Sequence, residues 1–259
     1  MIVIKDLYKS FDGFEVLKGI NLTIDDGEAV AIMGRSGTGK SVLVKHIVRL
    51  LRPTRGEVYV DGVRVDTADE KTLMEIRKKF GYVFQMGALF DFYTIEQNLY
   101  LPLYERGIRL TKEELRKKAT AVLERVGLDE RVLDLYPDEL SGGMRKRASI
   151  ARAIITEPRY IIYDEPTTGL DPITADLIND LIADLNEDLH TTTIVITHDL
   201  RCAFKTTHRI VLLYEGRIVF EGTPEEALRS DVEEVRKFIQ AFGIRELVEE
   251  GENPPQATG

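Results

Sequence analysis

The sequence has one cysteine, no long apolar run and a shortage of positive charge, and each absence narrows what the chain can be. Cys202 has no second thiol for an intramolecular disulfide and no neighbours at metal-ligand spacing, so neither a disulfide framework nor redox chemistry is expected. No stretch approaches the roughly 18 consecutive apolar residues that span a bilayer. The segment Met1–Lys9 lacks the basic and then apolar layout of a secretory signal. We expect the chain to stay in the cytoplasm.

The charge balance argues against generic nucleic-acid binding. The formal net charge is -9 at pH 7, whereas affinity for nucleic acid comes mainly from Lys and Arg contacts with phosphates. The short basic runs Arg116–Lys118 and Arg145–Arg147 are typical of solvated helix faces. We therefore expect no nucleic-acid partner. The 259 residues, 43% of them hydrophobic, suffice for one large domain or for a core with an inserted subdomain.

The pattern of apolar residues predicts an α/β fold. Helical spacing of apolar residues predicts a helix over Thr111–Val126. Two continuous apolar or β-branched runs, Tyr160–Tyr163 and Thr192–Thr197, flank a helical pattern over Thr174–Leu189, which is typical of a parallel βαβ core. In the first third, short runs rich in Val, Ile and Tyr alternate with turn residues, which predicts an antiparallel layer. The strands expected in this third of the chain are residues 2–4, 16–17, 20–24, 29–33 and 56–65, and they look like an antiparallel layer beside a nucleotide core.

A glycine-rich segment fits the phosphate-binding pattern GxxxxGK[ST]. It follows the expected strand Ala29–Met33 and precedes the helical pattern Val42–Leu51, which is the context that this motif requires. Glycines let backbone N–H groups point at phosphate oxygens, and the helix adds its positive end. We expect Lys40 to reach the β and γ phosphates and Ser41 to place its hydroxyl on Mg²⁺. The predicted nucleotide-binding residues are Gly34, Arg35, Ser36, Gly37, Thr38, Gly39, Lys40 and Ser41, with Val42 next to them.

Two acidic residues follow the apolar run Tyr160–Tyr163. P-loop enzymes hold magnesium with a carboxylate at the end of a buried neighbouring strand, which makes Asp164 the candidate. Glu165 comes next, and on an extended backbone its side chain would point away from that of Asp164. We therefore expect Glu165 to face the water that attacks the γ phosphate and to act as the general base. Pro166 is expected to end the strand.

A P-loop alone leaves kinases, GTPases and many ATPases open, and a later motif decides between them. Leu140–Gly143 resembles the ABC signature, usually LSGGQ, and lies shortly before the Asp164–Glu165 pair as in that family. The chain is identified on this motif as a member of the ABC ATPases. The other family motifs follow in order: Gln85 after the strand Gly81–Phe84 is similar to the Q-loop, Gly169–Leu170–Asp171 to the D-loop, and His198 to the H-loop.

The resemblance implies a domain plan. ABC ATPases are P-loop NTPases with a RecA-like core, an antiparallel β layer and a helical subdomain. We expect residues 1–222 to form the ATPase domain, with the helical subdomain inserted at about 88–158. Residues 223–259 are expected to form a C-terminal helical extension, helical at 224–228 and 232–242, with a disordered end. As a hypothesis, the tail after Thr223 reaches a neighbouring subunit or a small accessory protein, because it is acidic and helical and carries Phe238, Ile239 and Phe242.

The resemblance also implies roles for single residues. His198 would contact the γ phosphate and hold the attacking water with Glu165, and Gln85 would touch magnesium or its water. Phe11 stands where the family places an aromatic residue that stacks on adenine, and Val16 is assigned to the same nucleotide site. The implied cofactors are ATP and Mg²⁺. The implied catalytic residues are Glu165, His198, Gln85 and Lys40.

A second copy of the chain is the first implied partner. Ser141, Gly142 and Gly143 open a helix, so they offer backbone N–H groups and a positive helix end to a phosphate. In the family that phosphate belongs to ATP held by the other subunit, so two nucleotides are buried head to tail and hydrolysis lets the pair reopen. Met144 departs from the usual glutamine, so a contact from that glutamine is not carried over to this chain.

Three stretches together look like the Mla-type ATPases, which serve lipid transport systems built around MCE proteins in bacterial envelopes and some plastids. They are the P-loop with Val42 and Leu43, the segment Phe84–Asp91 after the Q-loop strand, and the basic signature Ser141–Arg147. This resemblance implies phospholipid transport, an MlaE-like permease and an MCE lipid-binding protein as partners. It places the chain peripherally on the cytoplasmic face of the inner membrane. The apolar residues after Gln85 suit a groove that receives a helix of the permease.

Other readings of the sequence stay open. An importer of amino acids or another small solute would use nearly the same catalytic parts. A soluble ABC ATPase of DNA repair or translation usually carries two cassettes, a long coiled coil or a zinc insertion, and none of these is present. A small-molecule kinase would offer no role for Ser141–Gly143.

Overall fold

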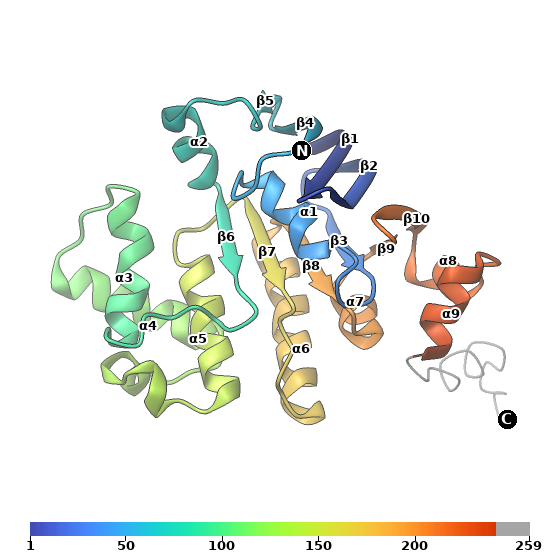
Figure 1. Ribbon diagram of the computed structural model, residues 1–259. Coiled ribbons are helices and arrows are strands. Elements are labelled where there is room, and N and C mark those ends of the chain that lie inside the picture. The colour runs from blue at the N-terminus through green and yellow to red at the C-terminus, as the bar shows by residue number, and fades with distance from the viewer. Residues whose placement is uncertain (242–259) are drawn as a thin grey trace, which may run out of the picture.

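The computed structural model describes residues 1–241, and its central feature is a sheet of six strands in the order β10-β9-β3-β8-β7-β6 (Figure 1). Neighbouring strands are parallel except β9 and β10, which form an antiparallel pair. Every residue of β3, β7 and β8 is buried, as expected for parallel strands covered on both faces. The strands are β3 (Ala29–Met33), β6 (Phe80–Val83), β7 (Tyr160–Asp164), β8 (Thr192–Thr197), β9 (Arg209–Tyr214) and β10 (Arg217–Gly222).

A second sheet is antiparallel, with the order β2-β1-β4-β5. Its first two strands run farther than the short apolar runs of the sequence predict, because Asp12 and Gly13 both adopt positive φ, of 47° and 84°, and close a tight hairpin. Together the two sheets confirm the predicted α/β fold with an antiparallel layer. The strands are β1 (Ile2–Phe11), β2 (Phe14–Ile24), β4 (Arg55–Val60) and β5 (Val63–Arg64).

Successive side chains of β3 point to opposite faces of the sheet, which separates two hydrophobic cores. Val30 and Ile32 face a core shared with α1 (Lys40–Ile47) and the antiparallel sheet. Ala31 and Met33 face the opposite side, against α7 (Leu200–Thr206) and the C-terminal helices. The predicted βαβ unit is present, since α6 (Pro172–Leu189) connects the parallel strands β7 and β8.

Between β6 and β7 the chain is mainly helical, and these helices lie at the left of Figure 1. Their apolar faces form a further core that continues onto Tyr163 of β7 and Ile178 of α6. Helix α4 begins after a capping box made by Thr111 and Glu114, which explains why the helix predicted over Thr111–Val126 is correct to one residue at each end. The elements are α3 (Ile95–Glu105), α4 (Lys112–Arg125), η1 (Glu130–Asp134), η2 (Pro137–Glu139) and α5 (Gly142–Ile154), while α2 (Glu70–Arg77) precedes β6.

The C-terminal part packs against the main body of the protein. Helices α8 (Pro224–Leu228) and α9 (Glu233–Ala241) follow β10, and α9 is strongly amphipathic. Phe238 and Ile239 are only 5% and 9% exposed, because they pack on the core beside β3 and β9. Two of the apolar side chains that prompted the hypothesis about the tail therefore pack within this chain. Phe242 and the last nine residues, expected to be disordered, lie outside the described residues. Within residues 1–241, no helix is long and apolar enough to cross a membrane.

Candidate nucleotide site

The glycine-rich loop joins β3 to α1 and depends on glycine at particular points. Gly34 has φ of 152°, and a Cβ there would overlap the carbonyl oxygen of Leu213 on β9. Gly39 has φ of 100°, and a Cβ there would lie 3.1 Å from Cγ1 of Val16. The loop therefore adopts a backbone that side chains would prevent. The predicted nucleotide-site residue Val16 lies directly against it.

Lys40 places a fixed positive charge inside this loop. Its side chain is 7% exposed, and Nζ donates hydrogen bonds to the carbonyl oxygens of Gly34, at 2.8 Å, and Arg35, at 3.2 Å. The same Nζ lies 3.4 Å from Oε1 of Glu165. A buried ammonium needs such partners, because desolvation without them is costly. The charge is thus held where the loop can present it to an anion.

Ser41 and Asp164 lie side by side at the start of α1 and the end of β7. The Ser41 hydroxyl donates to Oδ1 of Asp164 at 3.0 Å, and the Tyr82 hydroxyl donates to Oδ2 at 3.1 Å. Burial raises the pKa of Tyr82, and the charge of Asp164 raises it further, so the phenol stays protonated and remains a donor. A hydroxyl beside a carboxylate is the oxygen donor set that Mg²⁺ prefers. The residues present therefore fit a magnesium ion.

Glu165 reaches the same place by a different backbone from the one expected. Its φ is 50°, in the left-handed region, whereas the sequence-based prediction assumed an extended strand. Strand β7 ends at Asp164, and the Glu165 N–H donates to the carbonyl oxygen of Ile196 at 2.8 Å, which holds the residue in this conformation. The Glu165 carboxylate nevertheless lies between Lys40 and His198. Its Oε1 is 3.4 Å from Nζ of Lys40, and its Oε2 is 2.7 Å from Nδ1 of His198.

His198 follows the last residue of β8, and its side chain is 47% exposed. An ionised carboxylate only accepts hydrogen bonds, so the 2.7 Å contact with Glu165 requires the proton on Nδ1. Gln85 follows β6 and is exposed, and its carbonyl oxygen accepts a hydrogen bond from Lys146. The structure thus brings together Lys40, Ser41, Asp164, Glu165 and His198.

Phe11 lies at the end of β1, outside the cluster just described. Its side chain is 41% exposed, and Lys9 Nζ lies 4.7 Å from the ring centroid. The loop residue Thr38 donates its hydroxyl to the carbonyl oxygen of Arg35 at 2.9 Å. The ring lies at the tip of the first hairpin, and its exposed part offers an aromatic surface to another planar group.

The segment Ser141–Gly143 forms the N-terminus of α5. Ser141 caps the helix, and its Oγ accepts a hydrogen bond from the Met144 N–H at 3.3 Å. Met144 packs partly against the helical core, which gives a physical reason for an apolar side chain at that position. Within residues 1–241, no hydrogen bond or ion pair joins this helix start to the glycine-rich loop.

Two residues of this region were not predicted from the sequence. Tyr82 reaches Asp164 because β6 pairs with β7. No local sequence pattern around Tyr82 indicates this contact. Lys146 was expected in a solvated basic face, but it is 6% exposed. Its position offered a signal, since Lys146, Ile150 and Ile154 follow at helical spacing and share one apolar face of α5.

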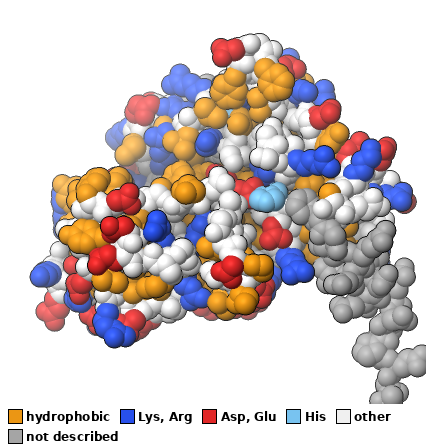
Figure 2. Space-filling view, turned by 60° about the horizontal axis from the view of Figure 1, so that its bottom comes forward, with side chains coloured by type: hydrophobic (Ala, Val, Ile, Leu, Met, Phe, Trp, Pro, Cys, Tyr) orange, Lys and Arg blue, Asp and Glu red, His pale blue; other side chains and the backbone are white. Residues whose placement is uncertain are grey.

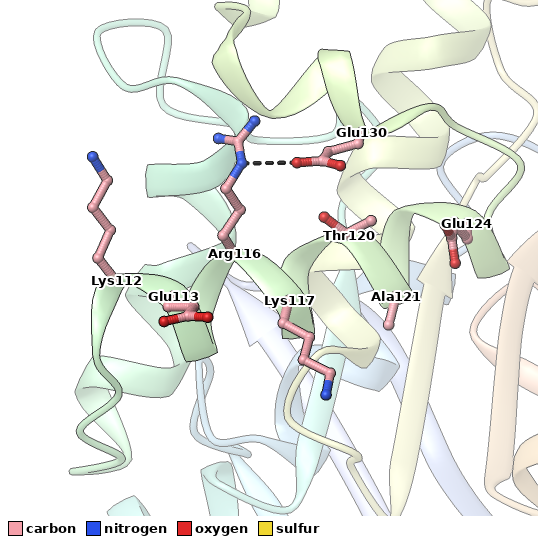
Figure 3. Close-up of a pocket in the computed structure, with 8 residues that line it drawn as sticks. All are labelled: Lys112, Glu113, Arg116, Lys117, Thr120, Ala121, Glu124 and Glu130. Atoms are coloured by element: carbon pink, nitrogen blue, oxygen red, sulfur yellow. Dashed lines mark hydrogen bonds and ion pairs between the residues drawn. The ribbon is translucent and has the colours of Figure 1, made fainter.

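A hollow of about 740 Å³ on the outer face of α4 has a different character (Figure 3). Its wall includes Arg116, which donates to Glu130 at 2.8 Å and also pairs with Asp134. Lys112 and Lys117 extend from the same helix. The residues that line this hollow are mostly charged side chains of a solvated helix, and none of them belongs to the glycine-rich loop.

Comparison with known proteins decides the family. A family model described as "ABC transporter" matches residues 17–168, more than half of the chain. The chain belongs to the ABC transporter ATP-binding family. The match begins in β2, includes the glycine-rich loop, Gln85, the Ser141–Gly143 segment and Glu165, and ends at Thr168.

Curated relatives of this cassette have several printed roles. The methionine import ATP-binding protein MetN of Carboxydothermus hydrogenoformans is 38% identical, over 96% of this chain and 74% of its own length. The probable ribonucleotide transport ATP-binding protein mkl of Mycobacterium tuberculosis is 38% identical, over 94% and 67%. The chloroplastic protein TRIGALACTOSYLDIACYLGLYCEROL 3 of Arabidopsis thaliana is 37% identical, over 92% and 73%.

Solved structures agree with this assignment. The ATP-binding cassette MJ0796, solved as a dimer in a post-hydrolysis state bound to ADP and Pi, is 37% identical with a TM-score of 0.80, over 86% of this chain and 99% of that chain. The cbiO1 protein of Clostridium perfringens, part of the ABC transporter complex cbiONQ, is 30% identical with a TM-score of 0.79, over 97% and 98%. The cassette is therefore an ATP-binding ATPase with the ABC fold.

Proposed function

We propose that the cassette hydrolyses ATP as a pair of identical chains and so drives a membrane permease. The observation that carries the proposal is the cluster at the ends of three core strands: Lys40 lies 3.4 Å from Glu165, Glu165 lies 2.7 Å from His198, and Ser41 bonds to Asp164. It combines a phosphate-binding cation, a carboxylate base with its orienting imidazole, and oxygen ligands for a metal. We assign these parts to residues 1–222, with the helical subdomain at about 88–158.

In the proposed mechanism each of these residues has one task. The Lys40 ammonium binds the phosphates of ATP within the loop, where its charge is already fixed. Ser41, Asp164 and Gln85 would hold Mg²⁺, which when bound neutralises charge on the transferred phosphoryl group. Glu165 takes the proton of the attacking water. His198, donating from Nδ1, holds the Glu165 carboxylate in the orientation that this proton transfer needs.

The second copy would complete the site. The start of α5 offers the free N–H groups and positive end of a helix, yet no hydrogen bond or ion pair of the described residues ties it to the loop of its own chain. The similar cassette MJ0796 was solved as a dimer with ADP and Pi. Ser141–Gly143 of one chain would therefore bind the ATP held by Lys40 and its loop in the other.

The membrane partner is assigned to a groove next to Gln85. The groove measures about 410 Å³ and lies between β6, the segment after it, α3 and α5. Phe90 lines the groove and is 45% exposed, and the same segment after β6 exposes Met86, at 84%, and Phe92, at 71%. Figure 2 shows apolar side chains gathered over this helical side of the molecule, at the left. Exposed apolar surface of this kind fits a partner helix.

The cargo that we infer is phospholipid. The residues after Gln85 and the basic signature resemble those of Mla-type ATPases, and one relative carries the name of a glycolipid, trigalactosyldiacylglycerol. The inferred partners are an MlaE-like permease, an MCE lipid-binding protein and an accessory protein. The cassette would then attach peripherally to the cytoplasmic face of the inner membrane.

Import of a small solute is the second candidate. It is favoured by the printed roles of two relatives, methionine import and ribonucleotide transport, at 38% identity. A mild-detergent pull-down of the tagged full chain from its native membrane, with mass spectrometry of proteins and lipids, separates the two. An MlaE-like permease with an MCE protein and phospholipid supports lipid transport. Recovery of a solute-importer permease would support a small solute as the cargo, and the proposed ATPase mechanism would be unchanged.

Two substitutions test the division of roles. Lys40→Ala should abolish productive ATP binding, because the charge inside the loop is lost. Glu165→Gln should keep ATP binding, lower the hydrolysis rate by about 10²–10⁴-fold as for other general bases, and accumulate an ATP-bound pair. Equilibrium ATP binding and size-exclusion chromatography measure both. Equal loss of ATP binding in the two variants would contradict the proposed roles.

A further inference from the structure

One buried lysine touches two of the segments described above. Lys146 lies on α5, five residues after Ser141, and is 6% exposed. Its Nζ donates a hydrogen bond to the carbonyl oxygen of Gln85 and lies 3.4 Å from the carbonyl oxygen of Glu165. The helix that begins with the signature is therefore connected, through one ammonium group, to the Q-loop and to the end of β7.

Burial lowers the pKa of Lys146, and the nearby carboxylates of Asp164 and Glu165 oppose that shift. An ammonium kept in such a place without partners would be destabilising, so its two carbonyl partners are a condition of its burial. An apolar side chain would pack there at a lower desolvation cost. The lysine therefore suggests a purpose other than stability.

The Glu165 backbone explains what the lysine can do. Its left-handed φ of 50° is sparsely populated by residues with side chains and persists only where the surroundings hold it. The N–H is held by the carbonyl of Ile196 at 2.8 Å. On the other side of the residue, the carbonyl oxygen is approached by Lys146. We expect the Glu165 peptide to relax when this contact is lost, which would move its carboxylate away from the position between Lys40 and His198.

A second basic residue of α5 holds the Q-loop but not Glu165. Arg152 donates to the carbonyl oxygens of Gly87, at 3.0 Å, and Ala88, at 2.5 Å. The segment after Gln85 thus lies along α5 at two points. Of these two basic residues, Lys146 is the one whose side chain also reaches Glu165.

We propose that Lys146 is a positioning residue of the ATPase, which fixes the Glu165 carboxylate and the Q-loop relative to the signature helix. The proposal rests on the role of Glu165 as the general base. The proposed contact would couple the two subunits. When Ser141 at the start of α5 binds the ATP of a second copy, α5 would shift, and the Lys146 ammonium on the same helix would pass that shift to Glu165.

The test uses the full-length chain and three variants. Lys146→Met keeps the length and removes the donors, and Lys146→Arg keeps charge and donors. Arg147→Met is the matched control, because Arg147 lies on the same helix and bonds a backbone carbonyl, that of Val126 at 3.1 Å, away from the site. Steady-state kcat and KM for ATP, equilibrium ATP binding and thermal unfolding are measured for each.

We expect Lys146→Met to lower kcat by about tenfold or more, the effect of losing one hydrogen bond to a charged group, while KM and the Kd for ATP change less than about threefold. Lys146→Arg should recover most of kcat, and Arg147→Met should leave it within about threefold of the wild type. Faster amide hydrogen exchange at Gln85–Ala88 in Lys146→Met alone would support the same contact.

Two results would overturn the role of Lys146. One is a kcat of Lys146→Met within about threefold of the wild type. The other is equal kcat in Lys146→Met and Arg147→Met at matched loss of thermal stability, because both would then act on folding. If Lys146→Met does not fold, the kcat of Lys146→Gln is compared with that of Arg147→Met instead, because glutamine keeps a hydrogen-bond donor on a shorter side chain. Unchanged hydrolysis in Glu165→Gln would instead refute the proposed function, so the two failures are distinguishable.

Discussion

Substituting Tyr82 by phenylalanine removes one hydroxyl and tests whether the Asp164 carboxylate is oriented for a metal. The two oxygens of Asp164 have separate donors, Ser41 on Oδ1 at 3.0 Å and Tyr82 on Oδ2 at 3.1 Å. Asp164 is 7% exposed, so water replaces the lost phenol poorly. The carboxylate then gains freedom to rotate about a single remaining donor.

The size of the effect follows from the charge of the acceptor. A hydrogen bond to a charged group contributes about 1.5–3 kcal/mol, and each 1.4 kcal/mol is about tenfold in an equilibrium constant. Donors that orient a metal ligand typically change metal affinity by about 10- to 100-fold. For Tyr82→Phe we therefore expect the Mg²⁺ concentration that half-saturates ATP hydrolysis to rise by about tenfold, with maximal kcat reduced less.

The assay is a Mg²⁺ titration of ATP hydrolysis at fixed free ATP. Tyr59→Phe is the matched control, because the Tyr59 hydroxyl lies 2.9 Å from the carboxylate of Glu57 on β4, in the antiparallel sheet. It should leave the Mg²⁺ dependence unchanged. A half-saturating concentration within about twofold of the wild type in Tyr82→Phe, or an equal shift in both variants, would refute the orientation of Asp164 by Tyr82.

Two further predictions concern stability and reactivity. Burial would raise the pKa of Asp61, but hydrogen bonds from Lys79, at 2.6 Å, and Tyr160 outweigh it and lower the pKa from 3.8 to about 2. Asp61→Asn should thus lose at most about 2.4 kcal/mol of unfolding free energy at pH 7. The difference between the two proteins should shrink from pH 4 to pH 2 in urea titrations, and a difference that does not depend on pH would contradict this. Burial raises the pKa of Cys202 to about 12, so thiol reagents at pH 8 should label it only after unfolding, as mass spectrometry of native and denatured samples would show.

The nucleotide loop could be predicted from the sequence because its context is local. A strand, the GxxxxGK[ST] pattern and a helix follow one another within Ala29–Ile47, and the structure places them in that order. The strand Thr192–Thr197 was also predicted at its observed bounds, because a continuous β-branched run between turn signals leaves little freedom.

The features of the site that could not be predicted from the sequence depend on which strands and helices become neighbours in the fold. The left-handed backbone of Glu165 is set by a hydrogen bond to Ile196, 31 positions later in the chain. Tyr82 acquires its role because β6 pairs with β7. Lys146 looked like one of three similar basic residues until α5 turned it toward Gln85, 61 positions away. Each case needs the sheet order, which no local pattern encodes.

The sheet order also shows why one chain holds an incomplete site under the proposed mechanism. Lys40, His198, Glu165 and Gln85 follow β3, β8, β7 and β6, which are consecutive neighbours in the parallel sheet. Groups from residues 40 to 198 therefore meet at the carboxyl edge of one sheet, where α/β proteins bind their ligands. The signature is the exception, because it begins α5 between β6 and β7 and follows no strand. Under the proposed mechanism this motif would reach the nucleotide held by a second copy, so pairing would be required for hydrolysis.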